Sequence, residues 1–274
     1  CKKGFHACEN PLDVLNSYDL VGSRFAEVEL QATEERSNED TIRVGTDIYI
    51  KRELSIKSFI RESHNYLRKK AKTAISATED VSHISSSGVM AQLVASGSGA
   101  CLASSGDRSQ LSASEDISHL AASGCSSVLI ASGDMSKLAA SGAMARLAAS
   151  GAAARLAASG AMTQLAASGN DSQLASSGLA TKLSASGNNS RIVASGDGSK
   201  LCATGAHAVV MCAGKDGMAK ASKGSWIVLT EWKKIRGKDV PVNVVAKMVD
   251  GVEIKENVYY TIKDGKFVQV GGSH

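Results

Sequence analysis

The sequence predicts a mainly β protein built around a β-solenoid, and three observations lead to this prediction. An aliphatic residue recurs at every ninth position, sixteen times from Ile75 to Val210. Gly follows four residues after nearly all of them, and most of the residues between are small. A fixed period over about half of a chain is typical of repeat proteins, in which each unit packs mainly against its neighbours.

An α-helix does not fit this period. Nine residues make about two and a half helical turns, so successive aliphatic side chains would point to opposite sides of the rod. The Ser-Gly pair in almost every unit also opposes a helix, although Ala is abundant. A short strand followed by a turn fits better.

We number the aliphatic residue of each unit position 0, so that a typical unit reads Leu-Ala-Ala-Ser-Gly-x-x-Ser/Ala-Lys/Arg/Gln. In an extended segment, side chains at positions 7, 0 and 2 share one side, and those at positions 8 and 1 share the other. The first set is small and apolar and is expected to face inward. Positions 3 to 6 are expected to form the turn, with Gly at position 4 in a left-handed conformation. Glu79 and Glu115 replace this Gly and are expected to be tolerated exceptions.

Stacked units of this kind predict a solenoid whose coils hydrogen-bond to one another at a spacing of about 4.8 Å. Two units per coil give about eight coils and a rod on the order of 40 Å long. Three units per coil, a triangular solenoid, is the alternative that the period leaves open. The small inner residues favour the flattened form with two.

Residues 1–53 predict a small α/β N-terminal module, which we expect to be incomplete because the chain opens on Cys1 rather than Met. Its expected elements are a strand at 4–8, a brief helix at 12–18 and strands at 24–30 and 41–51.

Residues 54–72 predict an amphipathic helix, since Ser55 can cap its start and its apolar residues fall on one face. Solenoids need their first coil covered, so this helix is expected to be a capping helix. The solenoid itself is assigned to residues 73–217.

Residues 218–274 predict a small antiparallel β module that caps the far end. The expected strands are 225–232, 242–249, 252–254, 258–262 and 266–270, with Asp250-Gly251 and Asp264-Gly265 as hairpin turns. Trp226 and Trp232 are expected to be buried packing anchors.

Composition argues against several functional classes. The net charge is +4 with 4% aromatic residues, which does not suit a strongly basic nucleic-acid-binding protein. An apolar run of the length needed for a transmembrane helix is not present. Cys1, His6 and Cys8 lack a second ligand pair for zinc, and the repeats lack the regular Asp and paired Gly of calcium-binding nonapeptides. We therefore predict no catalytic, cofactor or metal site, and no cofactor.

The segments flanking the repeat carry a resemblance. The motifs KGFHACENPLDVLN, starting at Lys3, and KGSWIVLTEW, starting at Lys223, resemble those of an uncharacterised family of phage and prophage proteins with an Ala/Ser/Gly repeat tract. The resemblance covers about a third of the chain. It implies a phage origin and brings no established activity.

A second resemblance supplies the alternative prediction. The strand–helix arrangement from Gly4, followed by the strand Phe25–Leu30, loosely resembles the central segment of ADP-ribosyltransferase-like folds. The first cofactor-binding element of such a fold would precede Cys1. The alternative is therefore an ADP-ribosyltransferase-like enzyme or relic, with the solenoid as a spacer.

Two outward-facing sets of repeat positions are candidate surfaces. Position 8 gives a polar and basic row, expected as two lines on opposite sides of the rod: Lys137, Arg146, Arg155, Lys182, Arg191 and Lys200. Gln residues interrupt this row and no aromatic residues accompany it, so solubility explains it more simply than phosphate binding.

Position 1 gives a nearly uncharged stripe and is the candidate interface: Val94, Ile130, Ala139, Ala148, Ala157, Ala166, Ala175 and Val193. Extended apolar patches usually mark interfaces, so two or more solenoids are expected to pack side by side through it. Replacing Ala148 and Ala166 with Glu is expected to dissociate such an assembly.

The sequence thus predicts a non-catalytic, phage-encoded structural or protein-binding repeat protein. Its expected partners are further copies of itself and a phage or host protein, whereas nucleic acid and membranes are not expected. The expected location is the host bacterial cytoplasm or the virion.

Overall fold

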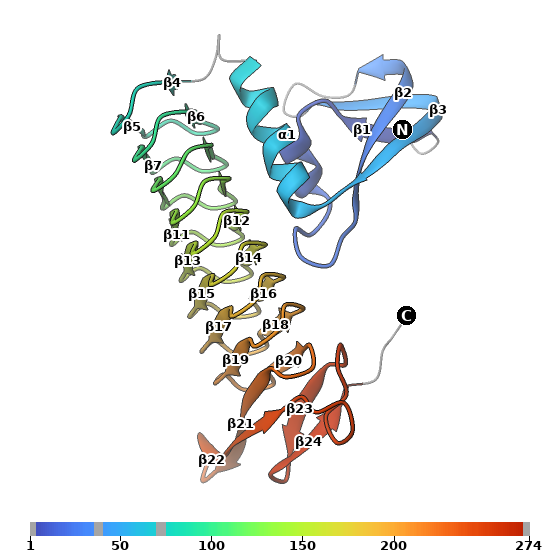
Figure 1. The fold of residues 1–274 in the computed structure, drawn as a ribbon, viewed down its shortest axis with the longest axis vertical. Coiled ribbons are helices and arrows are strands. Elements are labelled where there is room, and N and C mark those ends of the chain that lie inside the picture. The colour runs from blue at the N-terminus through green and yellow to red at the C-terminus, as the bar shows by residue number, and fades with distance from the viewer. Residues whose placement is uncertain (1–3, 36–40, 70–74, 271–274) are drawn as a thin grey trace.

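The computed structural model describes residues 4–35, 41–69 and 75–270 and confirms a mainly β protein with a β-solenoid at its centre. The solenoid forms a rod (Figure 1). The N-terminal module lies beside the first half of this rod, and the C-terminal module closes its far end.

The N-terminal module contains the elements that the sequence predicts. They are β1 (Phe5–Cys8), the 3₁₀-helix η1 (Pro11–Asn16), β2 (Phe25–Glu35), β3 (Ile42–Leu54) and the helix α1 (Ile56–Lys69). The three strands form an antiparallel sheet in the order β1-β3-β2. Residues 70–72 of the predicted helix lie outside the described residues.

The solenoid strands fall into two sheets. The even-numbered strands are β4 (Ile75–Ala77), β6 (Gln92–Ala95), β8 (Gln110–Ala113), β10 (Val128–Ala131), β12 (Arg146–Ala149), β14 (Gln164–Ala167), β16 (Lys182–Ala185), β18 (Lys200–Ala203) and β20 (Met218–Ala221). The odd-numbered strands are β5 (His83–Ser86), β7 (Cys101–Ser104), β9 (His119–Ala122), β11 (Lys137–Ala140), β13 (Arg155–Ala158), β15 (Gln173–Ser176), β17 (Arg191–Ala194) and β19 (Val209–Cys212).

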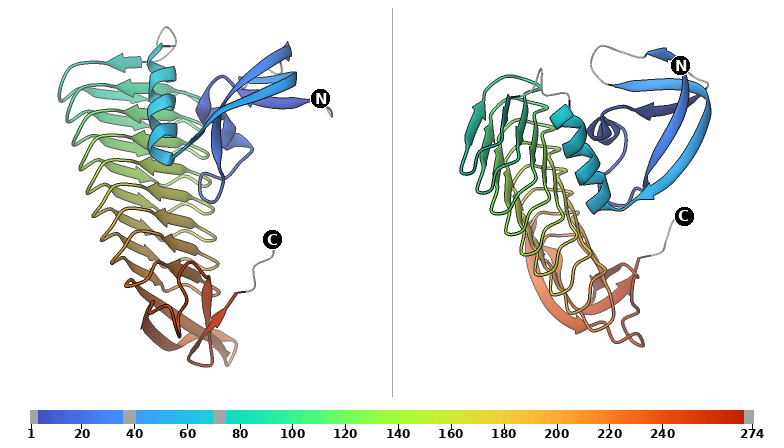
Figure 2. Two further views of the ribbon diagram at one scale, coloured as in Figure 1. Left: turned by 45° about the vertical axis from the view of Figure 1, so that its right-hand side comes forward. Right: turned by 45° about the horizontal axis from the view of Figure 1, so that its top comes forward.

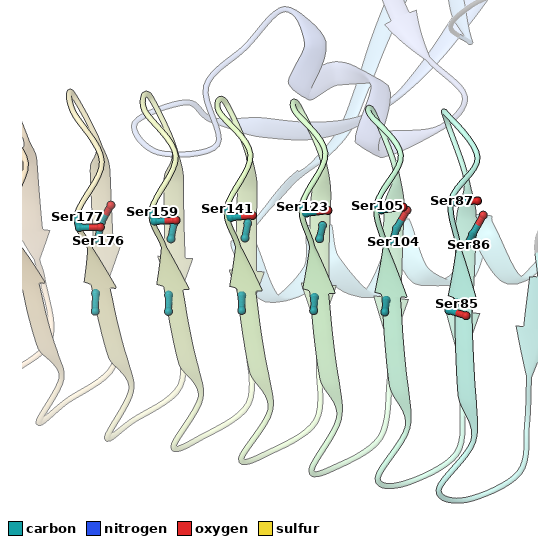
Figure 3. Close-up of a pocket in the computed structure, with 18 of the residues that line it drawn as sticks. Ser85, Ser86, Ser87, Ser104, Ser105, Ser123, Ser141, Ser159, Ser176 and Ser177 are labelled. Carbon is teal, nitrogen blue, oxygen red and sulfur yellow. The ribbon is translucent and has the colours of Figure 1, made fainter.

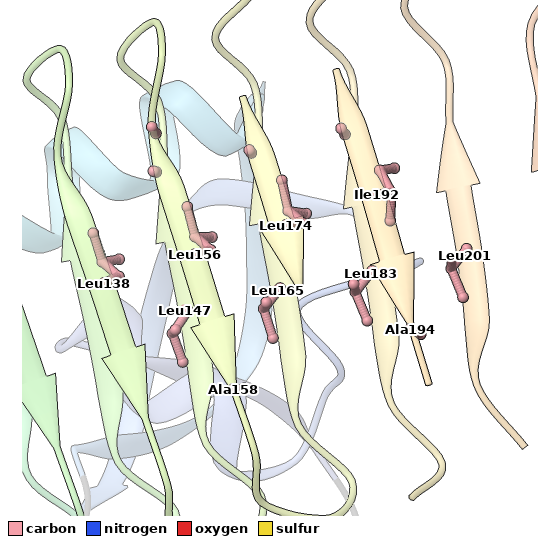
Figure 4. Packing of buried hydrophobic residues seen from close by; sticks show 14 of the residues in the cluster. Leu138, Leu147, Leu156, Ala158, Leu165, Leu174, Leu183, Ile192, Ala194 and Leu201 are labelled. Carbon is pink, nitrogen blue, oxygen red and sulfur yellow. The ribbon is translucent and has the colours of Figure 1, made fainter. Parts of the chain in front are cut away.

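Each solenoid strand pairs in parallel with the strand one coil away, and paired residues are 18 apart in sequence, as in Leu147 with Leu165 and Leu138 with Leu156. This register confirms two units per coil and excludes the triangular alternative. The aliphatic residues at position 0 form stacked ladders in a fully buried core, with Ala at position 2 beside them (Figure 4).

The turns differ from the prediction, because the left-handed residue stands at position 6 and not at the Gly of position 4. Positive φ values recur at position 6 in every turn from Val81 to Asp216, and most of these residues are not Gly. The Gly at position 4 is needed for a different reason. A Cβ atom on Gly160 would lie 2.1 Å from the carbonyl oxygen of Gly142 in the preceding coil. The coils therefore approach too closely at this corner for a side chain.

Side chains in the turns satisfy backbone groups that the strands leave unpaired. Ser at position 7 donates to the carbonyl oxygen of position 4, as from Ser136 to Gly133 at 2.9 Å. Asp or Asn at position 5 accepts from the backbone N–H of the next coil, as Asp134 does from Ala152 at 2.7 Å. The Ser bond lies within one turn, whereas the Asp or Asn bond ties successive coils together.

The predicted position of α1 over the first coil is wrong. The helix packs on the side of the rod, against β6, β8, β10 and β12, and runs along the long axis of the solenoid (Figure 2). The sheet face offers the helix an apolar surface that spans several coils, so its amphipathic side is buried there.

The C-terminal module comprises β21 (Trp226–Ile235), β22 (Lys238–Met248), β23 (Tyr260–Lys263) and β24 (Lys266–Gln269). The strand β21 pairs in parallel with β19 and antiparallel with β22, whereas β23 pairs antiparallel with β20 and β24. Both solenoid sheets therefore continue into this module.

The structure differs from the prediction for the C-terminal region in three details. The strand β20 adds a further repeat unit, in which Ala219 stacks on Leu201, so the solenoid passes the predicted boundary at residue 217. Residues 252–254 form no strand, and Asp250-Gly251 joins no hairpin. The hairpin of β21 and β22 turns at Arg236-Gly237 instead. The turn at Asp264-Gly265, between β23 and β24, is confirmed.

Candidate binding surface

The solenoid has two broad faces formed by side chains at positions 8 and 1. We call the outer face of the even-numbered strands the covered face and that of the odd-numbered strands the open face. The repeat is the same in both. Their surroundings are not, because among the described residues the N-terminal module and Tyr259 of the C-terminal module pack on the covered face (Figure 2).

The covered face holds half of the predicted interface stripe. Its position-1 residues form a second buried core with the N-terminal module, in which the following residues take part: Val94, Ile130, Ala148, Ala166, Leu12, Leu15, Leu20, Phe25, Phe59, Ile60 and Leu67. Ile130 is fully buried and Ala148 is 1% exposed. The prediction that these positions are free for a second molecule is wrong, because the module of the same chain already occupies them.

Polar side chains at position 8 fix the module in register. The amide of Gln164 accepts from the backbone N–H groups of Leu20 and Val21 and donates to Asp19 Oδ1 at 2.6 Å. The Lys182 ammonium pairs with Asp19 Oδ2. This hydrogen bond holds the pKa of Asp19 below its ordinary value, although burial opposes the shift. Burial lowers the pKa of Arg146 beside this group, and the charge of Asp19 partly offsets that effect.

A second set of polar contacts joins the N-terminal module to β8 on the covered face. Gln110 donates to Asp13 Oδ1 and accepts from Asn10 Nδ2, both at 3.3 Å. His64 Nδ1 of α1 lies 2.8 Å from the hydroxyl of Ser112. Side chains at positions 8 and 1 of the covered face therefore serve internal docking.

The C-terminal module covers the lower end of the same face. The ring of Tyr259 lies 4.3 Å from Lys200 Nζ and 4.9 Å from Lys220 Nζ, in the geometry of a cation–π contact. Burial raises the pKa of Tyr259, and Cys202 adds to this effect. Lys200 of the predicted row thus contacts the C-terminal module.

The open face carries the rest of the predicted stripe. Its position-1 residues Ala139, Ala157 and Ala175 are exposed, and Val193 is 41% exposed. A shallow groove follows positions 1 to 3 along the rod, from Ser85 on β5 to Ser195 after β17 (Figure 3). The groove is lined by Ala and Ser, so its surface is smooth and uncharged.

A basic row borders this groove. Lys137, Arg155, Gln173 and Arg191 stand in register at position 8 of successive odd strands. All four are exposed, and no carboxylate among the described residues pairs with the three cations. The structure therefore separates the predicted basic residues into two lines, of which only this line is free of internal docking.

The lower end of the open face is apolar, which the sequence analysis missed. Val209, Trp226 and Met248 align across β19, β21 and β22. Trp226 was expected to be buried but is 47% exposed. The signal was the spacing after Val210, where the period shortens by one residue and places Trp226 at an outward position 8.

No group of three His, Cys, Asp or Glu residues in the described part of the chain is arranged to hold a metal ion. His6 is exposed on β1, whereas Cys1 lies outside the described residues. The described helices include none with the length and apolar character needed to cross a membrane.

Comparison with known proteins gives a match for the N-terminal region. Residues 1–62 match a family described as a domain of unknown function (DUF7666), a range that reaches from β1 into α1. No curated protein and no solved structure matches the chain. The matched range falls in the module that docks on the covered face, and the solenoid lies outside it.

Proposed function

We propose that this protein is a non-catalytic scaffold that binds another protein through the open face of its solenoid. The observation that carries the proposal is the contrast between two faces built from the same repeat. One face buries its apolar stripe against the N-terminal module, whereas the other leaves its stripe exposed.

The covered face supplies a precedent within the same molecule. It shows that an apolar stripe beside a polar row can bind a helix and a loop, with hydrogen bonds from Gln164 and Ser112 to the bound segment. The open face repeats both features and adds an exposed apolar end around Trp226. Aromatic residues of this kind are often the residues that contribute most to binding at interfaces.

Side-by-side assembly of several copies, as expected from the sequence, has only the open face available. It would use Ala139, Ala157, Ala175 and Val193 rather than the covered half of the stripe. A phage origin, with a phage or host protein as a further partner, is part of this proposal and rests on the resemblance of the flanking segments.

Site-specific photo-crosslinking in bacterial cells tests the proposal. A photoreactive residue replaces Ala139, Ala157 or Ala175 in the full-length protein, and Leu179, exposed on a turn, is the control. We expect the same discrete adduct from the three face positions and none from the turn. Absence of adducts from the face, or equal adducts from Leu179, contradicts the proposal.

The alternative of an ADP-ribosyltransferase-like enzyme or relic in residues 1–53 remains a prediction. The matched family is described only as a domain of unknown function and names no activity. The buried contacts of this module with the solenoid support a docking role for it.

A further inference from the structure

We infer that the open face binds an acidic amphipathic helix of a different protein, which lies along the rod as α1 does on the covered face. This inference rests on the proposed function and specifies the chemistry of the partner. Three observations support it: the charge of the face, the precedent of the covered face and the spacing of the strands.

The charge on the open face has one sign. At positions 8, 1 and 3 of the odd-numbered strands from β5 to β19, the only charged side chains are Lys137, Arg155 and Arg191, with His83 and His119 in the same row. None of the three cations has an ion-pair partner within the described ranges. A complementary surface therefore carries carboxylates along one edge and apolar side chains in the middle.

The covered face already binds carboxylates in the corresponding row. Asp13 contacts Gln110, and Asp19 contacts both Gln164 and Lys182. These contacts lie beside the apolar stripe that α1 buries. The same arrangement of carboxylates beside an apolar helix face would satisfy the open face.

The spacing of the strands suits a helix. Successive strands are about 4.8 Å apart, and one helical turn rises about 5.4 Å. Carboxylates one turn apart on a helix parallel to the rod can therefore meet the cations of neighbouring strands, within the reach of their long side chains. The helix α1 contacts four successive strands in this orientation.

Other occupants fit less well. A second copy brings the same basic row and offers no acidic side chain on this face. A nucleic acid would find cations, but β5–β19 present no aromatic side chain on which bases can stack. These two occupants are outcomes of the test.

The test uses full-length protein and three synthetic helical peptides of about 20 residues. All three share one Leu/Ala stripe, which is flanked by Glu, Gln or Lys. At low ionic strength we expect fluorescence anisotropy to show about tenfold tighter binding of the Glu peptide than of the Gln peptide. The variant K137E/R155E/R191E should invert this order in favour of the Lys peptide, and Lys234→Glu on the exposed β21–β22 hairpin should leave it unchanged.

The outcomes separate this inference from the proposed function. Equal affinity for the three peptides, or no binding of the Glu peptide, overturns the inference. The proposed function still stands if the face positions give crosslinked adducts. Tighter binding of a single-stranded oligonucleotide, lost in the triple variant, identifies a nucleic acid instead. A dimer in light scattering that Ala157→Glu dissociates identifies a second copy and also overturns the inference.

Discussion

The two faces of the solenoid arise from one repeat, yet they have different surroundings. On the even-numbered strands the chain folds back, and position 1 becomes part of a core. On the odd-numbered strands the same position stays exposed. A repeat fixes the shape of a rod, but the segments at its ends decide which face is free to bind.

Consecutive repeat units make this contrast measurable. Ala148 and Ala157 occupy the same position of neighbouring units, nine residues apart, and lie on opposite faces. Gln164 and Gln173 form a second such pair at position 8. The two members of each pair stand at the same position of neighbouring repeat units. A difference between the effects of the same substitution at the two sites therefore measures the contribution of the covering module.

The largest difference is expected for introduced charge. Ala148→Glu places a carboxylate beneath α1, where burial of an unpaired charge costs several kcal/mol, so we expect a loss of more than about 3 kcal/mol of unfolding free energy or detachment of the N-terminal module. Ala157→Glu should change the unfolding free energy by less than about 0.5 kcal/mol. Denaturant unfolding measures both, and similar losses in the two variants would contradict the contrast.

Truncation of apolar side chains should give the next largest difference. Ile130→Ala removes a fully buried side chain between β10 and the N-terminal module, and such changes cost about 2–5 kcal/mol. Val193→Ala on the open face should cost less than about 1 kcal/mol, since its side chain already contacts solvent. Hydrogen exchange in α1 provides the readout: faster exchange is expected only for Ile130→Ala. Unchanged protection in that variant would show that the helix does not depend on this contact.

A smaller effect is expected at the two glutamines. Gln164→Ala removes the acceptor of two backbone N–H groups and the donor of a hydrogen bond to Asp19. We therefore expect the unfolding free energy to fall by about 1–3 kcal/mol. Gln173→Ala, on the open face, should have an effect within about 0.5 kcal/mol. Thermal unfolding compares the two variants. Equal midpoints would mean that Gln164 does not hold the loop at Leu20.

The smallest effect is a dependence on pH. The pKa of Asp19 is lowered in the folded protein, so its contribution to stability is present above the ordinary pKa of aspartate, near 4, and is lost as pH falls through that range. Both partners are partly exposed, which limits the effect. We expect proteolysis of the N-terminal module to accelerate slightly below about pH 4. Asp19→Asn should reduce this pH dependence, and an unaltered profile would show that other groups cause it.

Much of the fold follows from the sequence because the repeat imposes one strong pattern. Two units per coil, inward positions 7, 0 and 2, and outward positions 8 and 1 are all confirmed by the register and the burial pattern. The smallness of Ala and Ser at the inner positions favoured a thin coil. Here local periodicity and tertiary structure agree.

The rest depends on contacts that periodicity does not encode. The amphipathic face of α1 indicates that the helix packs on something apolar, but not whether it packs on the first coil or on a sheet face. The role of Gly160 comes from its distance to Gly142 in the preceding coil, which is known only once the register is known. The exposure of Trp226 depends on a one-residue change in spacing after Val210. The sequence therefore identified the stripe but did not reveal that the N-terminal module covers half of it.

Thiol labelling tests the contrast between the faces most directly. Ala148→Cys and Ala157→Cys are single, small changes, and both sites lie in tryptic peptides without native cysteine, residues 147–155 and 156–182. Under native conditions we expect a small alkylating reagent to label Cys at position 157 at least about 100-fold faster than at position 148, a ratio that corresponds to about 2.7 kcal/mol of protection. Comparable labelling rates would show that the N-terminal module does not cover the even-numbered strands and would contradict the account.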